Sequence, residues 1–217
     1  MIFEKVTLPT YTKGEEIFNS VSHGAGILFG IFTMIFCILN STTPNGILGS
    51  VVFALSSIIL YSSSTLYHAL TIEKVKKVFR LIDHSVIFIM ITGTTLAINI
   101  ISVYPHNKVL SLISAFLGLA GTVTGIVLTF IDQEKYKNVQ LVLYVVAFTS
   151  LLLAHPLFVH CDEPLKIVLL VFGGGAVYGI GMVFYIVGKK KKYFHSIFHL
   201  FVLAGTIFHF FAIVTAL

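Results

Sequence analysis

The chain has few charged residues, and this scarcity decides its class. Only 11% of its 217 residues are Asp, Glu, Lys or Arg, whereas 57% are hydrophobic, and the mean hydropathy is +0.98. Soluble globular domains carry about 25% charged residues. The composition therefore excludes a soluble globule of this length and indicates a membrane protein.

Charge is absent from six long stretches, which are 17–72, 84–107, 109–131, 138–161, 167–188 and 193–217. A transmembrane helix needs about 20 mostly apolar residues. The first stretch is long enough for two helices, with the turn-like sequence NSTTPNG (40–46) between them. Alternating strands typical of a membrane barrel are missing. We therefore expect an all-α integral membrane bundle that forms a single domain over 1–217, with seven helices at about 18–39, 46–70, 81–102, 109–130, 138–158, 165–187 and 194–216.

Cysteine is also scarce, since Cys37 and Cys161 are the only two. No CxxC pair is present, so the sequence gives no sign of a thiolate metal site. Both thiols fall near the predicted outer face, where a disulfide is one option and two isolated thiols are the favoured interpretation. The first 16 residues lack the features of a cleavable signal peptide, so we expect the first helix to direct insertion.

The positive charges are distributed unevenly between the predicted loops. With the N-terminus in the cytoplasm, twelve of the fourteen Lys and Arg residues fall in cytoplasmic segments, and only Lys108 and Lys166 fall outside. The positive-inside rule then predicts a cytoplasmic N-terminus and an external C-terminus. The KKKK run at 189–192 is interpreted as part of this signal, compatible with anionic lipid head groups, and no nucleic-acid partner is expected.

Five polar residues share one predicted depth near the cytoplasmic boundary. Ser64 and His68 end the second helix, Asp83 begins the third, and His195 and His199 begin the last. Ionisable side chains are costly inside a bilayer, so several at one depth indicate a functional site. Within each pair on a helix the spacing is four residues, which places both side chains on one face.

Three imidazoles from two helices match a catalytic zinc site, which uses three protein ligands and leaves a position for water. In this interpretation His68, His195 and His199 bind Zn²⁺. Asp83 holds and deprotonates the water, and Ser64 orients it or donates to a developing oxyanion. The alternatives are histidines that hydrogen-bond between helices and an aspartate that merely caps its helix or lies in its first turn. Spacing alone also admits copper, nickel or iron.

Other polar residues are interpreted as neighbours of this site. Those on the first helix either orient a ligand or belong to an ordinary capped helix start, and they are Glu15, Glu16, Asn19 and His23. His84 points away from the direction of Asp83, and His209 lies too deep to reach the same ion.

Four motifs occur in order along the chain: EEIFNSVSHGAG (15–26), SSSTLYH (62–68), RLIDHSVIFIMITGT (80–94) and FHSIFHLFVLAGTIFHFFA (194–212). As an ordered set they resemble the haemolysin III family of bacterial membrane proteins. That family belongs to the progestin and adiponectin receptor group and is related to alkaline ceramidases. The long N-terminal extension of the animal receptors is absent, so the resemblance does not imply adiponectin binding.

The resemblance implies a seven-helix fold with a cytoplasmic N-terminus and a zinc ion near the cytoplasmic side. The family's zinc histidines fall on His68, His195 and His199. Its aspartate that contacts water at the metal falls on Asp83, and its site serine falls on Ser64.

Together, residues and resemblance predict a zinc-dependent hydrolase of a lipid amide or ester in the bacterial plasma membrane, ceramidase-like in its chemistry. Membrane lipids and a lipid substrate are its expected partners. Two other interpretations stay open: a haemolysin that lyses host membranes, and a receptor-like sensor or regulator of membrane lipid state with structural zinc. A pore would need a polar helix stripe, and a transporter would need charged groups along a path across the bilayer, whereas here the polar groups cluster on one side.

Overall fold

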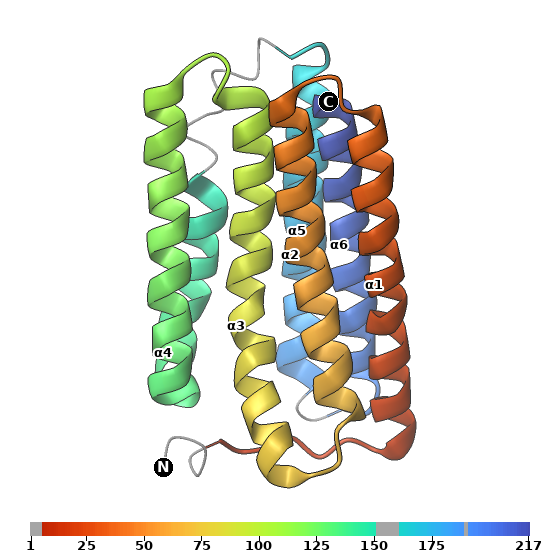
Figure 1. Cartoon of the computed structure of the whole chain (residues 1–217). Helices are drawn as coiled ribbons and strands as arrows, with labels where there is room; N and C mark the ends of the chain where they lie inside the picture. The colour runs from red at the N-terminus through yellow and green to blue at the C-terminus, as the bar shows by residue number, and fades with distance from the viewer. Residues whose placement is uncertain (1–5, 151–160, 189–190) are drawn as a thin grey trace.

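The computed structural model describes residues 6–150, 161–188 and 191–217. Within these ranges all regular structure is helical, and six helices are long and apolar enough to cross a membrane. They are α1 (Lys13–Asn40), α2 (Pro44–Ala69), α3 (Glu73–Ile98), α4 (Lys108–Thr149), α5 (Pro164–Gly188) and α6 (Phe194–Ala216), and a short π-helical segment, η2 (Asn99–Val103), extends α3. The expected all-α architecture is confirmed (Figure 1).

Capping residues fix where the first two helices begin. Thr12 and Glu15 form a capping box, in which the Thr12 hydroxyl accepts from the Glu15 backbone N–H and the Glu15 carboxylate accepts from the Thr12 N–H at 2.8 Å. As a result α1 begins a few residues earlier than predicted. Thr43 caps α2, with Pro44 in its first turn, where no backbone N–H is needed. The break predicted at 40–46 is confirmed as the turn between α1 and α2.

The third helix also begins earlier than the sequence predicted. It starts at Glu73 rather than at residue 81, because the charged segment 73–80 continues the helix beyond its apolar part. Asp83 therefore lies about 15 Å along the helix from its first residue. The prediction that Asp83 begins this helix is wrong, and capping does not explain its presence.

A kink divides α4 into two arms. The backbone of Asp132 leaves helical geometry, with φ −167° and ψ 96°. Its carboxylate accepts from the backbone N–H of Lys135 at 3.0 Å, as a helix N-cap does. The helical hydrogen bonding thus stops and restarts at this residue.

The two arms, 108–131 and 133–149, fold back on each other. Gln140 Nε2 donates to Thr129 Oγ1 at 3.1 Å across the hairpin, and Figure 1 shows the arms side by side. The arms coincide with the fourth and fifth predicted helices, of which the last residues, 151–158, lie outside the described ranges. At 42 residues, α4 is thus a helical hairpin and not one rod.

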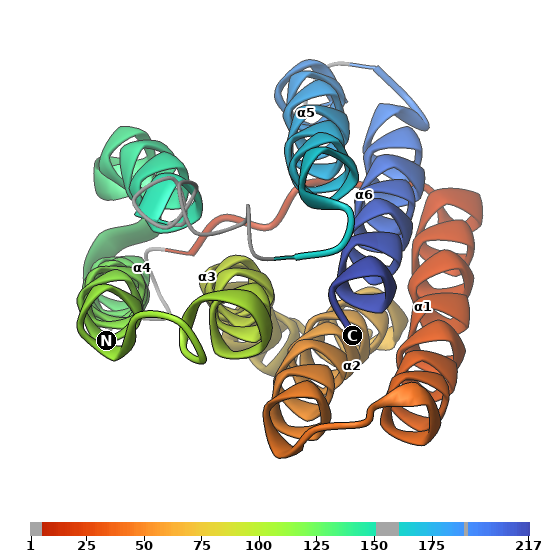
Figure 2. The same cartoon turned by 90° about the horizontal axis from the view of Figure 1, so that it is seen from above.

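Most consecutive helices pack against each other, and the last helix packs against the first. α1 contacts α2, α2 contacts α3, α3 contacts α4, and α6 contacts both α5 and α1. Figure 2 shows the arms of α4 on the far side of α3 from α1 and α6. Gly26 permits the close approach of α1 and α2, because a Cβ there would lie 2.5 Å from the Tyr61 ring. Segments from both ends of the chain therefore share one interior.

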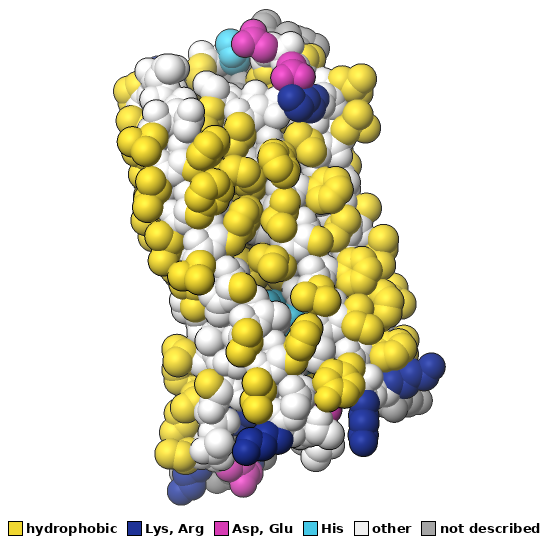
Figure 3. Space-filling model, turned by 90° about the vertical axis from the view of Figure 1, so that its right-hand side faces the viewer, with side chains coloured by type: hydrophobic (Ala, Val, Ile, Leu, Met, Phe, Trp, Pro, Cys, Tyr) yellow, Lys and Arg dark blue, Asp and Glu magenta, His cyan; other side chains and the backbone are white. Residues whose placement is uncertain are grey.

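The surface between the two ends of the molecule is apolar. Figure 3 shows hydrophobic side chains over the middle of the bundle, with most of the visible Lys and Arg side chains at one end. Exposed members of this band include Leu28, Ile35, Phe116 and Val183. Such a band matches the hydrocarbon layer, and the basic end matches the head-group region. We refer to this end, where α1, α3 and α6 begin, as the basic end.

Both cysteines are free, in agreement with the interpretation favoured from the sequence. Cys37 is buried in α1, and Cys161 is partly buried before the start of α5. Within the described residues the helices are therefore held by packing and hydrogen bonds, without a disulfide between these two thiols.

Candidate metal centre

Three histidine side chains from two helices meet inside the bundle. His68 lies in the last turn of α2, and His195 and His199 lie in the first two turns of α6. The Nε2 atoms of His195 and His199 are 3.1 Å apart, and those of His195 and His68 are 3.4 Å apart. All three rings are buried, and one nitrogen of each lies within 4.8 Å of the others. The three predicted ligands therefore converge.

The nitrogen separations fit a shared metal ion. Two imidazole nitrogens bound to a tetrahedral zinc ion at about 2.0–2.1 Å stand about 3.3 Å apart. Protons alone do not satisfy three facing Nε2 atoms, because each neutral nitrogen offers either one proton or one lone pair. A cation that accepts three lone pairs removes this conflict. The cluster could therefore hold a metal ion.

Polar atoms without partners surround the three rings. Among the described residues, the buried atoms that lack a hydrogen-bond partner include both ring nitrogens of His23, Nδ1 of His199 and Oδ1 of Asn19. Buried polar atoms are nearly always paired with protein groups or ordered water. Their concentration here fits a centre that is completed by an ion and water.

A carboxylate on α1 fixes the orientation of His68. Nδ1 of His68 donates to Glu16 Oε2 at 2.6 Å, and Lys76 Nζ donates to Glu16 Oε1 at 2.6 Å. A proton held at Nδ1 leaves the lone pair of Nε2 facing the other two histidines. Of the two roles that the sequence left open for the acids of α1, Glu15 caps the helix and Glu16 orients a histidine.

Two further rings enclose the candidate ligands. His23 of α1 stacks on His199 with ring centroids 3.8 Å apart, and Tyr11 stacks on His195 with centroids 4.9 Å apart. Burial raises the pKa of the Tyr11 hydroxyl above its ordinary value, so this group stays neutral. Sequence reasoning missed Tyr11, because it lies in a polar segment before the first helix.

Asp83 reaches the centre from α3. Its carboxylate interacts with the Ser64 hydroxyl, with His68 and with Arg80, which lies one turn earlier on the same helix. Ser64 is buried on α2, four residues before His68. The structure therefore brings the predicted carboxylate and hydroxyl next to His68, one of the three histidines, and their chemical roles stay predictions.

The two histidines that the sequence analysis did not count as ligands, His84 as a neighbour and His209 as too deep, have other partners. The ring nitrogens of His84 lie 2.9 Å from the Arg80 carbonyl oxygen and 3.0 Å from the Tyr185 hydroxyl. His209 Nε2 donates to the Val171 carbonyl at 3.1 Å. Neither ring belongs to the cluster of three, as predicted.

With this geometry established, comparison with known proteins identifies the family. A family model described as haemolysin-III related matches residues 11–210. The chain belongs to the haemolysin-III related family. It is 31% identical over 207 residues to the hemolysin-3 homolog of Bacillus subtilis (strain 168), which covers 94% of each chain. It is 30% identical over 214 residues to the hemolysin-3 of Bacillus cereus, covering 97% of this chain and 95% of the relative. No solved structure matches it significantly.

We expect the detergent-purified protein to carry about one divalent metal ion per chain, because the cluster supplies one three-nitrogen site. The double variant His195→Ala/His199→Ala should lose the ion while it keeps its helical content. Elemental analysis by mass spectrometry, together with circular dichroism, measures both. His106→Ala removes an exposed histidine at the opposite end and should leave the metal content unchanged. Metal retained by a folded double variant would make these histidines structural contacts only.

Glu16→Gln should weaken metal binding by about 10- to 100-fold, because a neutral amide, which can donate as well as accept, holds the proton of His68 at Nδ1 less firmly than a carboxylate does. Competition with a chelator of known affinity measures this change. Glu73→Gln is the matched control, since Glu73 is an exposed carboxylate paired with Lys77 at 2.7 Å. Equal affinities in wild type and Glu16→Gln would refute the orienting role.

Proposed function

We propose that this protein is a zinc-dependent hydrolase of a lipid amide or ester in the bacterial plasma membrane. The observation that carries the proposal is the convergence of three histidine Nε2 atoms beside Asp83 and Ser64 within an apolar bundle. Catalytic zinc sites use three protein ligands and leave one position open, whereas structural sites are usually closed by four. Among the described residues, three ligating side chains form the group.

His68, His195 and His199 would hold the ion. Zinc, when bound at such a site, supplies a Lewis acid for a carbonyl oxygen and lowers the pKa of water to about 7. In this proposal Asp83 accepts a proton from water and returns it to the leaving nitrogen or oxygen. The Ser64 hydroxyl orients the Asp83 carboxylate or donates to the carbonyl oxygen as negative charge develops there. The water oxygen joins the acyl carbon as the C–N or C–O bond breaks.

The depth of the centre favours a lipid substrate. His195 and His199 lie in the first two turns of α6, at the basic end, and the helix surfaces farther along are apolar. The amide or ester bond of a lipid lies close to its head group, whereas its acyl chains lie in the hydrocarbon layer. A lipid in the surrounding layer thus has its scissile bond at the depth of the histidines.

We further propose that the arms of α4 cross the membrane separately, which gives seven crossings, a cytoplasmic N-terminus and an external C-terminus. A straight helix of 42 residues would be about 63 Å long, roughly twice the hydrocarbon thickness. The kink at Asp132 and the concentration of Lys and Arg at the basic end support this topology.

Single cysteines in a Cys37→Ser/Cys161→Ser background test this topology. In intact cells, Lys166→Cys should react with a membrane-impermeant maleimide, whereas Lys135→Cys, next to the α4 kink, should react only after permeabilisation. Both positions are exposed on the molecule, so access depends on the side of the membrane. Labelling of both in intact cells, or the reverse pattern, would contradict the proposal.

A second candidate function is lysis of host membranes, which the names of the relatives from Bacillus cereus and Bacillus subtilis favour. The helix surfaces do not favour a pore, because the exposed positions of the described helices are largely apolar. Lysis through altered lipids would depend on the metal centre. If the folded His195→Ala/His199→Ala protein still lyses membranes, then lysis does not depend on the metal centre and is separate from the proposed hydrolysis.

Asp83→Asn should retain the metal and the fold while turnover falls by about 100-fold or more, because the general base is lost. Ser64→Ala should lower turnover by a similar factor if its hydroxyl stabilises the oxyanion. Hydrolysis of a panel of lipid amides and esters in vesicles measures both effects. Ser63→Ala is the matched control, since the buried Ser63 hydroxyl donates to the Leu60 carbonyl at 2.9 Å.

If a metal-replete Asp83→Asn protein turns over substrate as fast as wild type, the Asp83 carboxylate has no role in the reaction. Absence of turnover by wild type across the panel, with zinc bound, would favour the third interpretation, in which structural zinc supports a sensor or regulator of membrane lipid state.

A further inference from the structure

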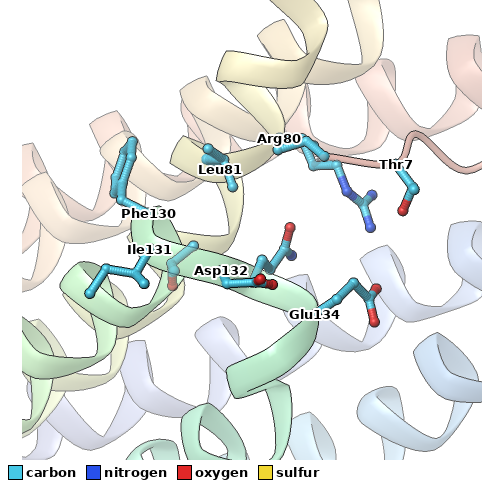
Figure 4. Close-up of a pocket in the computed structure, with 10 residues that line it drawn as sticks. Thr7, Arg80, Leu81, Phe130, Ile131, Asp132 and Glu134 are labelled. Atoms are coloured by element: carbon cyan, nitrogen blue, oxygen red, sulfur yellow. The ribbon is translucent and has the colours of Figure 1, made fainter. Parts of the chain in front are cut away.

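A cavity opens at the basic end beside the metal centre. Its volume is about 310 Å³. The N-terminal segment 7–11 forms one side, and Arg80 of α3, Glu134 of α4 and Tyr185 of α5 line the remainder. A smaller pocket shares Arg80 and Glu134 with it, and Figure 4 shows Arg80 extending from α3 toward Thr7 there.

This cavity and the metal centre share a wall of two tyrosine rings. Tyr11 lines the cavity and stacks on His195, with ring centroids 4.9 Å apart. Tyr185 also lines it, and its ring centroid lies 5.8 Å from that of His195. A molecule in the cavity would therefore lie next to the candidate reaction site.

Arg80 is the feature of the cavity that the proposed reaction does not use. Its side chain is buried, with 7% of the residue exposed, and Nη1 donates to the Tyr67 hydroxyl at 3.3 Å. The guanidinium also interacts with the Tyr185 hydroxyl, which lines the same cavity. Among the described residues, the ion pairs at 2.6–3.1 Å are formed by other side chains. Glu134, on the facing arm, pairs with Lys137 at 3.1 Å.

A buried charge is costly unless an opposite charge lies close to it. Asp83 interacts with Arg80 but also with Ser64 and His68, so its charge is shared. A guanidinium offers five N–H donors in a planar fork that fits phosphate and carboxylate groups. With the Tyr67 and Tyr185 hydroxyls as partners, the guanidinium still has further N–H donors to offer to a molecule in the cavity.

We infer that this cavity binds the anionic head group of the lipid substrate, with a phosphate or carboxylate held by Arg80. The identification of the bound lipid as the substrate rests on the proposed function, whereas the binding of an anionic head group does not. A volume of about 310 Å³ lies at the lower end of the range of ligand pockets, which suits a head group without its acyl chains. Anionic lipids concentrate at basic surfaces of this kind, which favours a lipid over a soluble anion.

Native mass spectrometry of the purified, metal-replete protein tests this site. The probe is an equal mixture of phosphatidic acid and phosphatidylcholine with matched acyl chains. Wild type should retain about ten times more phosphatidic acid than phosphatidylcholine. A factor of this size is expected for hydrogen bonds to a charged group. Arg80→Gln should lose this preference. Lys74→Gln, which removes an exposed charge from the same helix, should keep it.

Three results would overturn the site: no preference in wild type, an equal preference in wild type and folded Arg80→Gln, or an equal loss in Lys74→Gln. If millimolar inorganic phosphate abolishes the preference, the cavity is a site for soluble anions and the lipid assignment is wrong. Metal content, measured in each variant, separates a lost head-group site from a collapsed centre.

A measurement on wild type avoids dependence on the folding of Arg80→Gln. Phosphatidic acid with a photoreactive group next to its phosphate should label the segment 7–11 or Tyr185. Labelling restricted to the outer helix faces would exclude the cavity. Preferential binding of phosphatidic acid without any turnover would support this site and contradict the proposed hydrolase. Turnover that Arg80→Gln leaves unchanged would support the hydrolase and contradict the head-group site.

Discussion

Three imidazole nitrogens that face one another at 3.1 and 3.4 Å in an apolar interior impose the constraint on which the bundle depends. Lone pairs in such a position repel unless a cation lies between them. The neighbouring groups follow from this requirement. Glu16 compensates positive charge and is itself balanced by Lys76, so α1, α2, α3 and α6 are joined around one point. In the described structure, α5 packs against this group mainly through α6, and α4 packs against it mainly through α3.

Regularities within a helix could be read from the sequence, whereas contacts between helices could not. The four-residue spacing of His195 and His199 predicts a shared face because the helix repeat is fixed, and the structure confirms it. Glu16 appears in the sequence as one of two acids at a helix start. The packing of α1 against α2 brings Glu16 to His68, whereas Glu15 binds Thr12 at the start of its own helix. The contact of Tyr11 with His195 spans nearly the whole chain, and no local pattern encodes it.

The errors in the predicted helices have the same origin. Charge-free stretches mark the part of a helix that lies in hydrocarbon, so they miss turns that continue into the head-group layer. The first two turns of α3 carry four of the positive charges, and for that reason the charge pattern predicts a loop there. Asp83 then looks like a terminal residue, although it lies well inside the helix. Its interior position makes it a stronger functional candidate, because the ordinary explanation by capping is gone.

The sequence separation of the ligands has a consequence for biosynthesis. His68 and His195 are 127 residues apart, and His195 lies in the last helix. At about 5–20 residues per second, a ribosome needs on the order of 10 s to make the intervening chain. During this interval His68 and Glu16 are already in the membrane while two of the three imidazoles do not yet exist. The centre therefore closes only after the start of α6 inserts, and its completion distinguishes a chain that includes His195 and His199 from one that ends before them.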